Sequence, residues 1–108
     1  MSKGYLGVFE QMVLLAVLRQ ENNAFGLEVR REIEAGAGRK VSRSAFYTTL
    51  DRLEKKGFVK WTPKTSDSTR RTAPIRLFEV TREGLAALKD SRGALEALWS
   101  GMDEVVQG

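Results

Sequence analysis

The sequence contains neither cysteine nor histidine. Without them the chain has no disulfide, no zinc site built on Cys or His ligands, no cysteine nucleophile and no imidazole base. Proline is scarce as well, and both copies, Pro63 and Pro74, bound one polar segment. We therefore expect no metal and no organic cofactor, and the enzyme classes that depend on Cys or His side chains are excluded.

Long apolar runs are also missing. The longest, Met12 to Leu18, is far shorter than the roughly 20 residues that a membrane-spanning helix needs, and no small-residue cleavage site follows it. We therefore expect a cytoplasmic protein with no membrane partner. At 108 residues, with 42% hydrophobic and 30% charged residues, the chain can build one domain around a single small core.

The excess positive charge is confined to the middle of the chain. Residues 39–76 hold eleven Lys or Arg and three Asp or Glu, a balance of +8, whereas residues 1–38 and 77–108 have balances of −1 and −3. A basic segment of this kind indicates nucleic-acid binding when a motif accompanies it. Charge alone leaves open a solvated surface with no partner.

The stretch from Val41 to Lys60 predicts a helix with one buried and one exposed face. Its apolar residues recur at i, i+4 and i+7, which places them on one side of a 3.6-residue period; they are Phe46, Leu50 and Leu53. Ser42 is a candidate N-cap, because its hydroxyl can accept a hydrogen bond from a backbone N–H that the helix start leaves unpaired. Gly57 suits the position after the helix end, where a positive φ costs glycine nothing.

The opposite face of this helix carries hydroxyls, cations and one acid. Its residues are Ser44, Tyr47, Thr48, Asp51, Arg52 and Lys55. These side chains are poor core material, but they can contact the phosphates or base edges of DNA. The sequence therefore predicts a DNA-recognition helix over residues 42–56.

Two further helices are expected before this one. The first is predicted from the helical spacing of Leu6, Phe9, Val13, Ala16 and Val17. Phe25, Val29 and Ile33 recur every four residues and predict the second, which residues 36–38 (Gly-Ala-Gly) end.

A β-hairpin is expected after the central helix. Residues 58–62 and 75–80 are β-type runs, and the polar segment from Pro63 to Pro74 separates them. Three helices followed by a hairpin is the order of a winged helix-turn-helix, in which the third helix enters the major groove and the wing lies along the neighbouring backbone. Cations of the wing would reach phosphates: Lys60, Lys64, Arg70 and Arg71. A surface loop with no partner is the alternative, and Trp61 is expected to pack under the wing.

A last helix is predicted from Thr81, a candidate N-cap, almost to the chain end. Its stripe follows a heptad spacing through Leu85, Leu88, Arg92, Leu95, Trp99, Met102 and Val106, widened by Leu98 and Val105. A lone helix cannot bury such a stripe, so it packs on its own domain or on a second copy, and we favour a symmetric homodimer. Gly93 and Gly101 interrupt the stripe and mark a crossing point or a cleft as the alternative to a continuous zipper.

The predicted fold is mainly α with a small β-hairpin. Residues 1–80 form a winged helix-turn-helix DNA-binding domain, and residues 81–108 form a C-terminal dimerisation helix, the two making one compact unit. The dimerisation residues are Leu85, Leu88, Leu95, Leu98, Trp99, Met102 and Val106.

Four motifs of the chain are similar to those of the PadR family of bacterial transcriptional regulators. They are LGVFEQMVLLAVL, AFGLEVRREIE, VSRSAFYTTLDRLEKKGFV and LFEVTREGLAAL, which together span nearly the whole chain. The resemblance implies a winged helix domain, a homodimer held largely by the C-terminal helix, and repression of a promoter that a small molecule or stress signal relieves. Because the sequence ends at Gly108, the chain resembles the short subfamily with a single C-terminal helix.

The resemblance also assigns roles to residues. Tyr47 matches the tyrosine of the family's recognition helix that contacts DNA backbone, and the family's other DNA-facing positions match Arg43, Ser44, Thr48 and Arg52, beside the cap Ser42. Ser44 departs from the glycine of many members. Thr72, Ala73 and Pro74 stand where family wings commonly carry Gly-Gly and basic residues, which distinguishes the part of this wing that would reach the minor groove.

Trp99 suggests an effector site. In the short subfamily a tryptophan on the dimer seam can pair with its symmetry mate and stack a planar aromatic ligand, and Trp99 has that position. Core packing is the alternative, because large aromatic residues on a heptad stripe usually pack.

Two other classes of function compete with a homodimeric repressor bound to promoter DNA. A winged-helix protein-interaction module would use the C-terminal stripe to bind a different chain. An enzyme is disfavoured, because Tyr47, Arg52 and Lys55 are expected on a convex face with no pocket to desolvate them.

Overall fold

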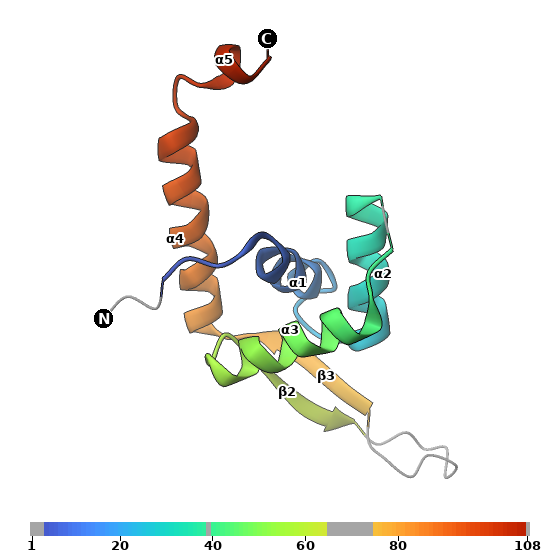
Figure 1. The fold of residues 1–108 in the computed structure, drawn as a ribbon. Coiled ribbons are helices and arrows are strands. Elements are labelled where there is room, and N and C mark those ends of the chain that lie inside the picture. The colour runs from blue at the N-terminus through green and yellow to red at the C-terminus, as the bar shows by residue number, and fades with distance from the viewer. Residues whose placement is uncertain (1–3, 39, 65–74, 108) are drawn as a thin grey trace.

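The computed structural model of the chain describes residues 4–38, 40–64 and 75–107. Its elements are α1 (Val8–Arg19), β1 (Ala24–Phe25), α2 (Gly26–Ala37), α3 (Arg43–Lys55), β2 (Val59–Lys64), β3 (Ile75–Val80), α4 (Arg82–Trp99) and α5 (Asp103–Gln107). Three helices precede the β2–β3 pair, and α4 rises from the body beside it (Figure 1). The predicted fold class, a mainly helical winged helix-turn-helix, is therefore confirmed.

The sheet has three antiparallel strands in the order β1-β3-β2. The predicted strand over residues 75–80 is confirmed, and Val59 lies opposite Val80 in the register. The structure adds β1, a two-residue strand on the far side of β3, which is too short to leave a periodic signal in the sequence. Pro63 is tolerated because β2 is an edge strand of the described sheet.

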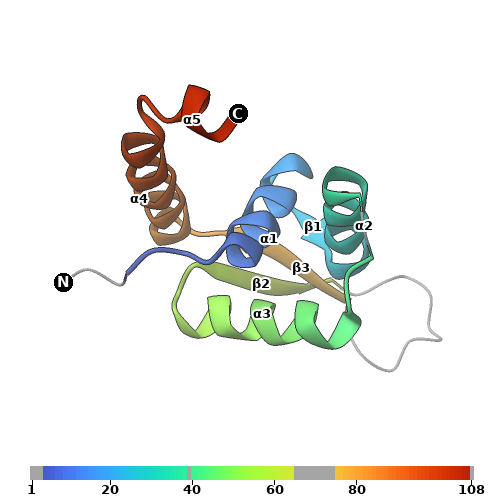
Figure 2. The same ribbon diagram turned by 45° about the horizontal axis from the view of Figure 1, so that its top comes forward.

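The core lies between α1, α2, α3 and the sheet (Figure 2). The apolar face predicted for the third helix is buried, with Phe46, Leu50 and Leu53 at most 2% exposed. Val13 and Val17 of α1 pack in the same cluster and are fully buried. The helix that bears the candidate DNA face is thus fixed from inside by its own apolar residues.

The first half of α4 belongs to the body of the domain. Gly84, Leu88 and Ser91 are buried, and the Leu6 N–H donates to the Ser91 hydroxyl across 2.9 Å. Thr81 caps α4 as predicted by accepting the Gly84 N–H at 3.0 Å, and its hydroxyl donates to the Gly57 carbonyl at 2.6 Å. The start of α4 is therefore attached to the turn that ends α3.

The expectation of one C-terminal helix running nearly to the chain end is wrong. The helix stops after Trp99, and Gly101 has a φ of +80°, which turns the chain before the short α5 begins at Asp103. Glycine adopts this conformation without the steric cost that other residues meet. None of the helices in the described ranges combines the length and the apolar character that a membrane span requires.

Candidate nucleic-acid interface

Both ends of α3 are fixed by the residues that the sequence predicted as its caps. The Ser42 side chain accepts a hydrogen bond from the Ala45 N–H at 3.3 Å, which caps the helix start. Gly57 has a φ of +80° after the helix end, and the Phe58 N–H donates to the Leu53 carbonyl at 2.9 Å. These bonds terminate α3 and direct the chain into β2.

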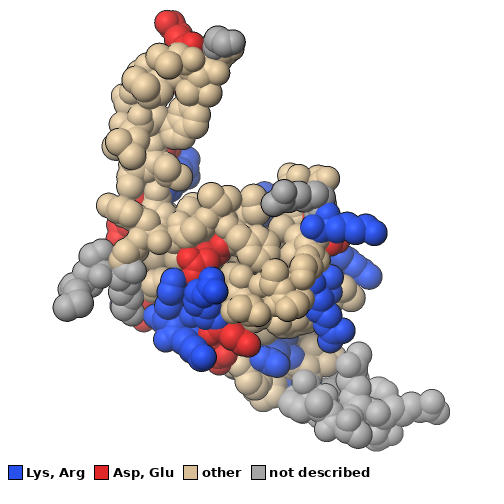
Figure 3. All heavy atoms as spheres, viewed as in Figure 1, with Lys and Arg blue, Asp and Glu red and all other residues tan. Residues whose placement is uncertain are grey.

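The outward face of α3 is polar and exposed. Its exposed residues include Arg43, Ser44, Thr48, Asp51, Arg52 and Lys55, and Ala45 and Glu54 of the same helix are exposed as well. Blue cationic side chains gather over α3 and the neighbouring part of the body, whereas most of the visible surface of α4 is uncharged (Figure 3). The first six offer two hydroxyls and three cations beside the carboxylate of Asp51, and none of them is a large apolar side chain.

Tyr47 is less exposed than the sequence indicated. Its side chain is half-buried, and its ring meets the Phe46 ring edge-on with centroids 5.1 Å apart. A Cβ added at Gly26 would lie 2.8 Å from the Tyr47 hydroxyl oxygen, so this hydroxyl rests against the start of α2. Tyr47 therefore lies at the junction of α2 and α3 rather than on the open face.

A partly buried ion pair, which the sequence analysis did not identify, fixes the other end of α3. Lys56 lies 2.9 Å from the carboxylate of Glu10, which is 8% exposed and also accepts the Gly7 N–H. Burial alone raises the pKa of Glu10. The Gly7 hydrogen bond and the positive charges of Lys56 and Arg52 outweigh burial and hold that pKa below its ordinary value of 4.5. Glu10 is therefore ionised at neutral pH and binds α3 to α1.

The described part of the wing carries two of its four predicted cations. Lys60 lies 3.9 Å from Glu79 on the neighbouring strand, and Lys64 is exposed at the end of β2. The other predicted contacts, Arg70 and Arg71, and the atypical segment 72–74 lie outside the described residues. Wing contacts to phosphate stay a prediction.

A pocket between α2, α3 and β3 holds a further cation that the sequence analysis missed. Arg43 of α3 and Arg76 of β3 both line this hollow of about 390 Å³. The Arg43 guanidinium lies 5.8 Å from the centroid of the Tyr47 ring, and that of Arg76 lies 5.1 Å from the centroid of the Trp61 ring. The register could have indicated this stack, because Trp61 and Arg76 fall on the same face of the β2–β3 ladder.

The second half of α4 and α5 expose an apolar surface. Leu95 and Trp99 are each 47% exposed and Leu98 is 75% exposed. A shallow hollow of about 200 Å³ is lined by Leu95, Leu98, Trp99, Met102 and Val106. Leu88, expected on the same seam, is instead buried in the core of its own chain, whereas Leu85 is exposed. Apart from Leu85, the exposed part of the stripe therefore begins at Leu95.

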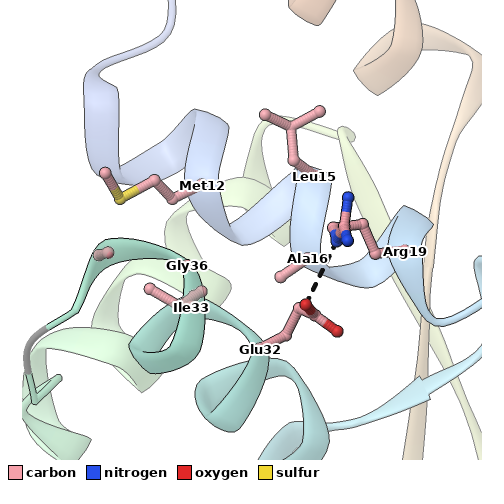
Figure 4. A pocket seen from close by; sticks show the side chains of 8 residues that line it. Met12, Leu15, Ala16, Arg19, Glu32, Ile33 and Gly36 are labelled. Atoms are coloured by element: carbon pink, nitrogen blue, oxygen red, sulfur yellow. Dashed lines mark hydrogen bonds and ion pairs between the residues drawn. The ribbon is translucent and has the colours of Figure 1, made fainter.

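A second apolar hollow of about 330 Å³ lies between α1 and α2. Met12, Leu15 and Ile33 line it, and Arg19 and Glu32 close one side with an ion pair of 3.2 Å (Figure 4). Leu15 is half exposed at its rim. Most of the side chains that line this hollow are apolar, so it offers an apolar surface.

Three helices, a hairpin and an outward polar helix face define a winged helix-turn-helix of the kind that binds DNA. Residues 14–90 match the family described as "Transcriptional regulator PadR-like family". The chain belongs to this PadR-like family, whose members are DNA-binding transcriptional regulators and not enzymes. No curated protein matches the chain significantly in sequence.

Solved structures share the fold of this chain. A PadR-like transcriptional regulator from Bacillus cereus strain ATCC 14579 is similar over 94% of each chain, at 20% identity and a TM-score of 0.74. A PadR family transcriptional regulator from Eggerthella lenta DSM 2243 covers 89% of this chain and 81% of its own, at 21% identity and a TM-score of 0.69. RosR of H. salinarum covers 91% of this chain and 78% of its own, at 28% identity and a TM-score of 0.63.

Proposed function

We propose that this chain is a homodimeric repressor that binds promoter DNA sequence-specifically through residues 42–56, with the wing (residues 60–76) along the neighbouring backbone. The single observation that carries the proposal is the construction of α3. Its apolar side is fully buried, its two ends are capped, and its outer side offers Ser44, Thr48 and Arg52 to a partner. Short hydroxyls and an arginine on a rigid helix can read base edges in the major groove.

The Glu10–Lys56 pair supports this role mechanically. It holds the end of α3 against α1, so the helix enters a groove as part of the body and not as a separate mobile element. Base readout needs such rigidity, because a bidentate contact discriminates between bases only when its geometry is fixed.

The homodimer is supported by the stripe from Leu95 onward. A monomer rarely leaves Leu95, Leu98 and Trp99 exposed side by side, and α4 carries them away from its own body (Figure 1). If two copies packed around a two-fold axis at this stripe, each would cover the stripe of the other, and the two α3 helices would lie on one face of a duplex. The half-sites are then expected about one helical turn apart.

A small planar aromatic effector would bind at the same seam. Trp99 and its symmetry mate would flank the ligand in the shallow hollow that Leu95, Met102 and Val106 also line. A planar aromatic dye should quench tryptophan fluorescence and release DNA, and Trp99→Leu should abolish both effects while the protein stays dimeric. Dye binding that survives Trp99→Leu contradicts this site.

Footprinting of the purified protein on its own upstream DNA tests the proposal. We expect protection of two half-sites, with an affinity that falls about 10³- to 10⁵-fold between 50 and 200 mM salt if 6 to 10 phosphates are contacted. Protection that unrelated DNA removes equally well contradicts sequence-specific binding.

A protein-interaction module is the competing function, because the same stripe could join a different chain. Mass in solution separates the two, since a stable homodimer leaves no stripe for another partner. A monomer without DNA affinity would favour the interaction module.

A further inference from the structure

The pocket between the recognition helix and the wing contains two arginines, each placed over an aromatic ring. Arg43 begins α3 and lies over Tyr47, and Arg76 comes from β3 and lies over Trp61. Both arginines line the same hollow of about 390 Å³, together with the start of α2 at Gly26. The two cations thus come from the two elements that a winged helix places against DNA.

The part of the chain that the structure describes pairs neither arginine with a carboxylate. Among the described residues Arg43 and Arg76 form no ion pair, although Asp51 is the one carboxylate that lines this pocket. Stacking uses the face of a guanidinium and leaves its N–H groups, which lie in its plane, free to donate hydrogen bonds. The aromatic rings therefore hold both side chains in place without occupying their donors.

A ligand for two such guanidinium groups must be an anion with several acceptor oxygens. Phosphate meets this requirement, because its oxygens accept paired N–H donors in the fork geometry that arginine presents. Half-buried Tyr47 adds a hydroxyl to the same pocket, and this hydroxyl lies against the first residue of α2.

We propose that this pocket takes one backbone phosphate of duplex DNA, which Arg76 and Arg43 contact and for which Trp61 is the positioning residue. The inference rests on the proposed function. It assigns Arg76 a contact that joins the wing to α3 across one phosphate, and it assigns Trp61 the task of fixing the Arg76 side chain before DNA arrives. A prearranged arginine loses less rotamer entropy on binding than a free one.

The first experiment compares the salt dependence of binding to the footprinted site for the wild type and Arg76→Ala. Each neutralised phosphate contributes about 0.9 to the slope of log K against log salt. Because Arg43 still contacts this phosphate, Arg76→Ala should lower the slope by up to about 1.8 in a homodimer. Affinity should fall about tenfold per protomer, as expected for a lost hydrogen bond to a charged group. Lys89→Ala removes the same charge from an exposed position on α4 and should leave both quantities unchanged.

The second experiment isolates Trp61 with a double-mutant cycle. Trp61→Leu keeps an apolar side chain but removes the ring, and affinity should fall about threefold per protomer, the size of an exposed cation–π contact. In the Arg76→Ala background the same change should have no further effect on affinity. Arg76→Lys keeps the charge and should retain the slope while it loses affinity, which tests the stack even if Trp61→Leu does not fold.

The outcomes separate this inference from the proposed function. Wild-type binding that is independent of salt, or equal for unrelated DNA, removes the proposed function. If the wild type binds its site with salt dependence and Arg76→Ala shows the same slope of log K against log salt, only the phosphate site is overturned. Inorganic phosphate at constant ionic strength distinguishes the source. If millimolar phosphate raises the melting temperature of the wild type but not of Arg76→Ala, while the two proteins bind DNA with the same slope, the pocket is a free-anion site and the assignment to DNA is overturned.

Discussion

Gly84 should be the least replaceable residue of α4. A Cβ added there would overlap the Phe58 carbonyl oxygen and would lie 2.8 Å from Val80 Cγ1. The Phe58 carbonyl cannot move freely, because it accepts the Thr81 N–H at 3.0 Å. Gly84→Ala must therefore separate α4 from the turn between α3 and β2.

The loss in free energy of unfolding caused by Gly84→Ala follows from two opposing effects. Overpacking of this kind costs about 3 kcal/mol, at the upper end of its usual range, because backbone and not a flexible side chain must yield. Alanine returns up to about 1 kcal/mol of helix propensity. The net loss of about 2 kcal/mol corresponds to a melting temperature about 10 °C lower for a domain of this size.

Gly93→Ala is the matched control in the same helix. Among the described residues, no atom outside Gly93's own stretch of helix lies within 4 Å of a Cβ added there, so helix propensity is the main effect and the melting temperature should rise by a few degrees. Thermal unfolding of the two variants and the wild type at one protein concentration gives the comparison, because dimerisation makes the midpoint depend on concentration. A Gly84→Ala protein as stable as Gly93→Ala would refute the close packing of α4 on the α3–β2 turn.

Three further changes test the fixed ends of α3 and the exposed stripe. Ser42→Ala should lower the free energy of unfolding by about 1 kcal/mol in urea titrations, whereas Ser44→Ala, which removes no cap, should not. Glu10→Gln should lower it by about 1–3 kcal/mol at pH 7. Because the pKa of Glu10 is lower in the folded state, the stabilisation by its ion pair is present above pH 4.5 and is lost as the pH falls through the folded-state pKa. The difference between Glu10→Gln and the wild type should therefore shrink in acid, and a constant difference from pH 7 to pH 3 would contradict the ion pair. Leu95→Asp should give monomers by light scattering while Ala97→Asp, off the stripe, stays dimeric; two dimers would remove the stripe from the interface.

Periodicity predicted the buried face of α3 well, because Phe46, Leu50 and Leu53 need only a helical repeat to share one side. The caps at Ser42 and Thr81 were also predictable, because each depends on residues three positions apart in the sequence. Local chemistry therefore predicted where both helices start.

Contacts between distant residues were not predictable in the same way. The pairs Glu10–Lys56 and Trp61–Arg76 join residues from different elements, and their meeting depends on the packing of α1 on α3 and on the register of the hairpin. The heptad spacing wrongly placed Leu88 on the exposed stripe, because the spacing of apolar residues does not tell which of them the chain covers itself. The spacing also predicted one helix that continues past Gly101, whereas a positive φ at that residue turns the chain and ends the helix within the stripe.

The claim that α3 reads bases is tested most directly by one ratio, measured for the wild type and for Arg52→Ala. It is the affinity for the footprinted upstream site divided by the affinity for an unrelated duplex. If the outer face of α3 reads bases, the ratio is large for the wild type and falls about tenfold or more in Arg52→Ala, because one base contact is worth about 1–3 kcal/mol of discrimination. Lys89→Ala should leave the ratio unchanged. A wild-type ratio near one, or an Arg52→Ala protein that loses equal affinity for both duplexes, would contradict base reading by this helix.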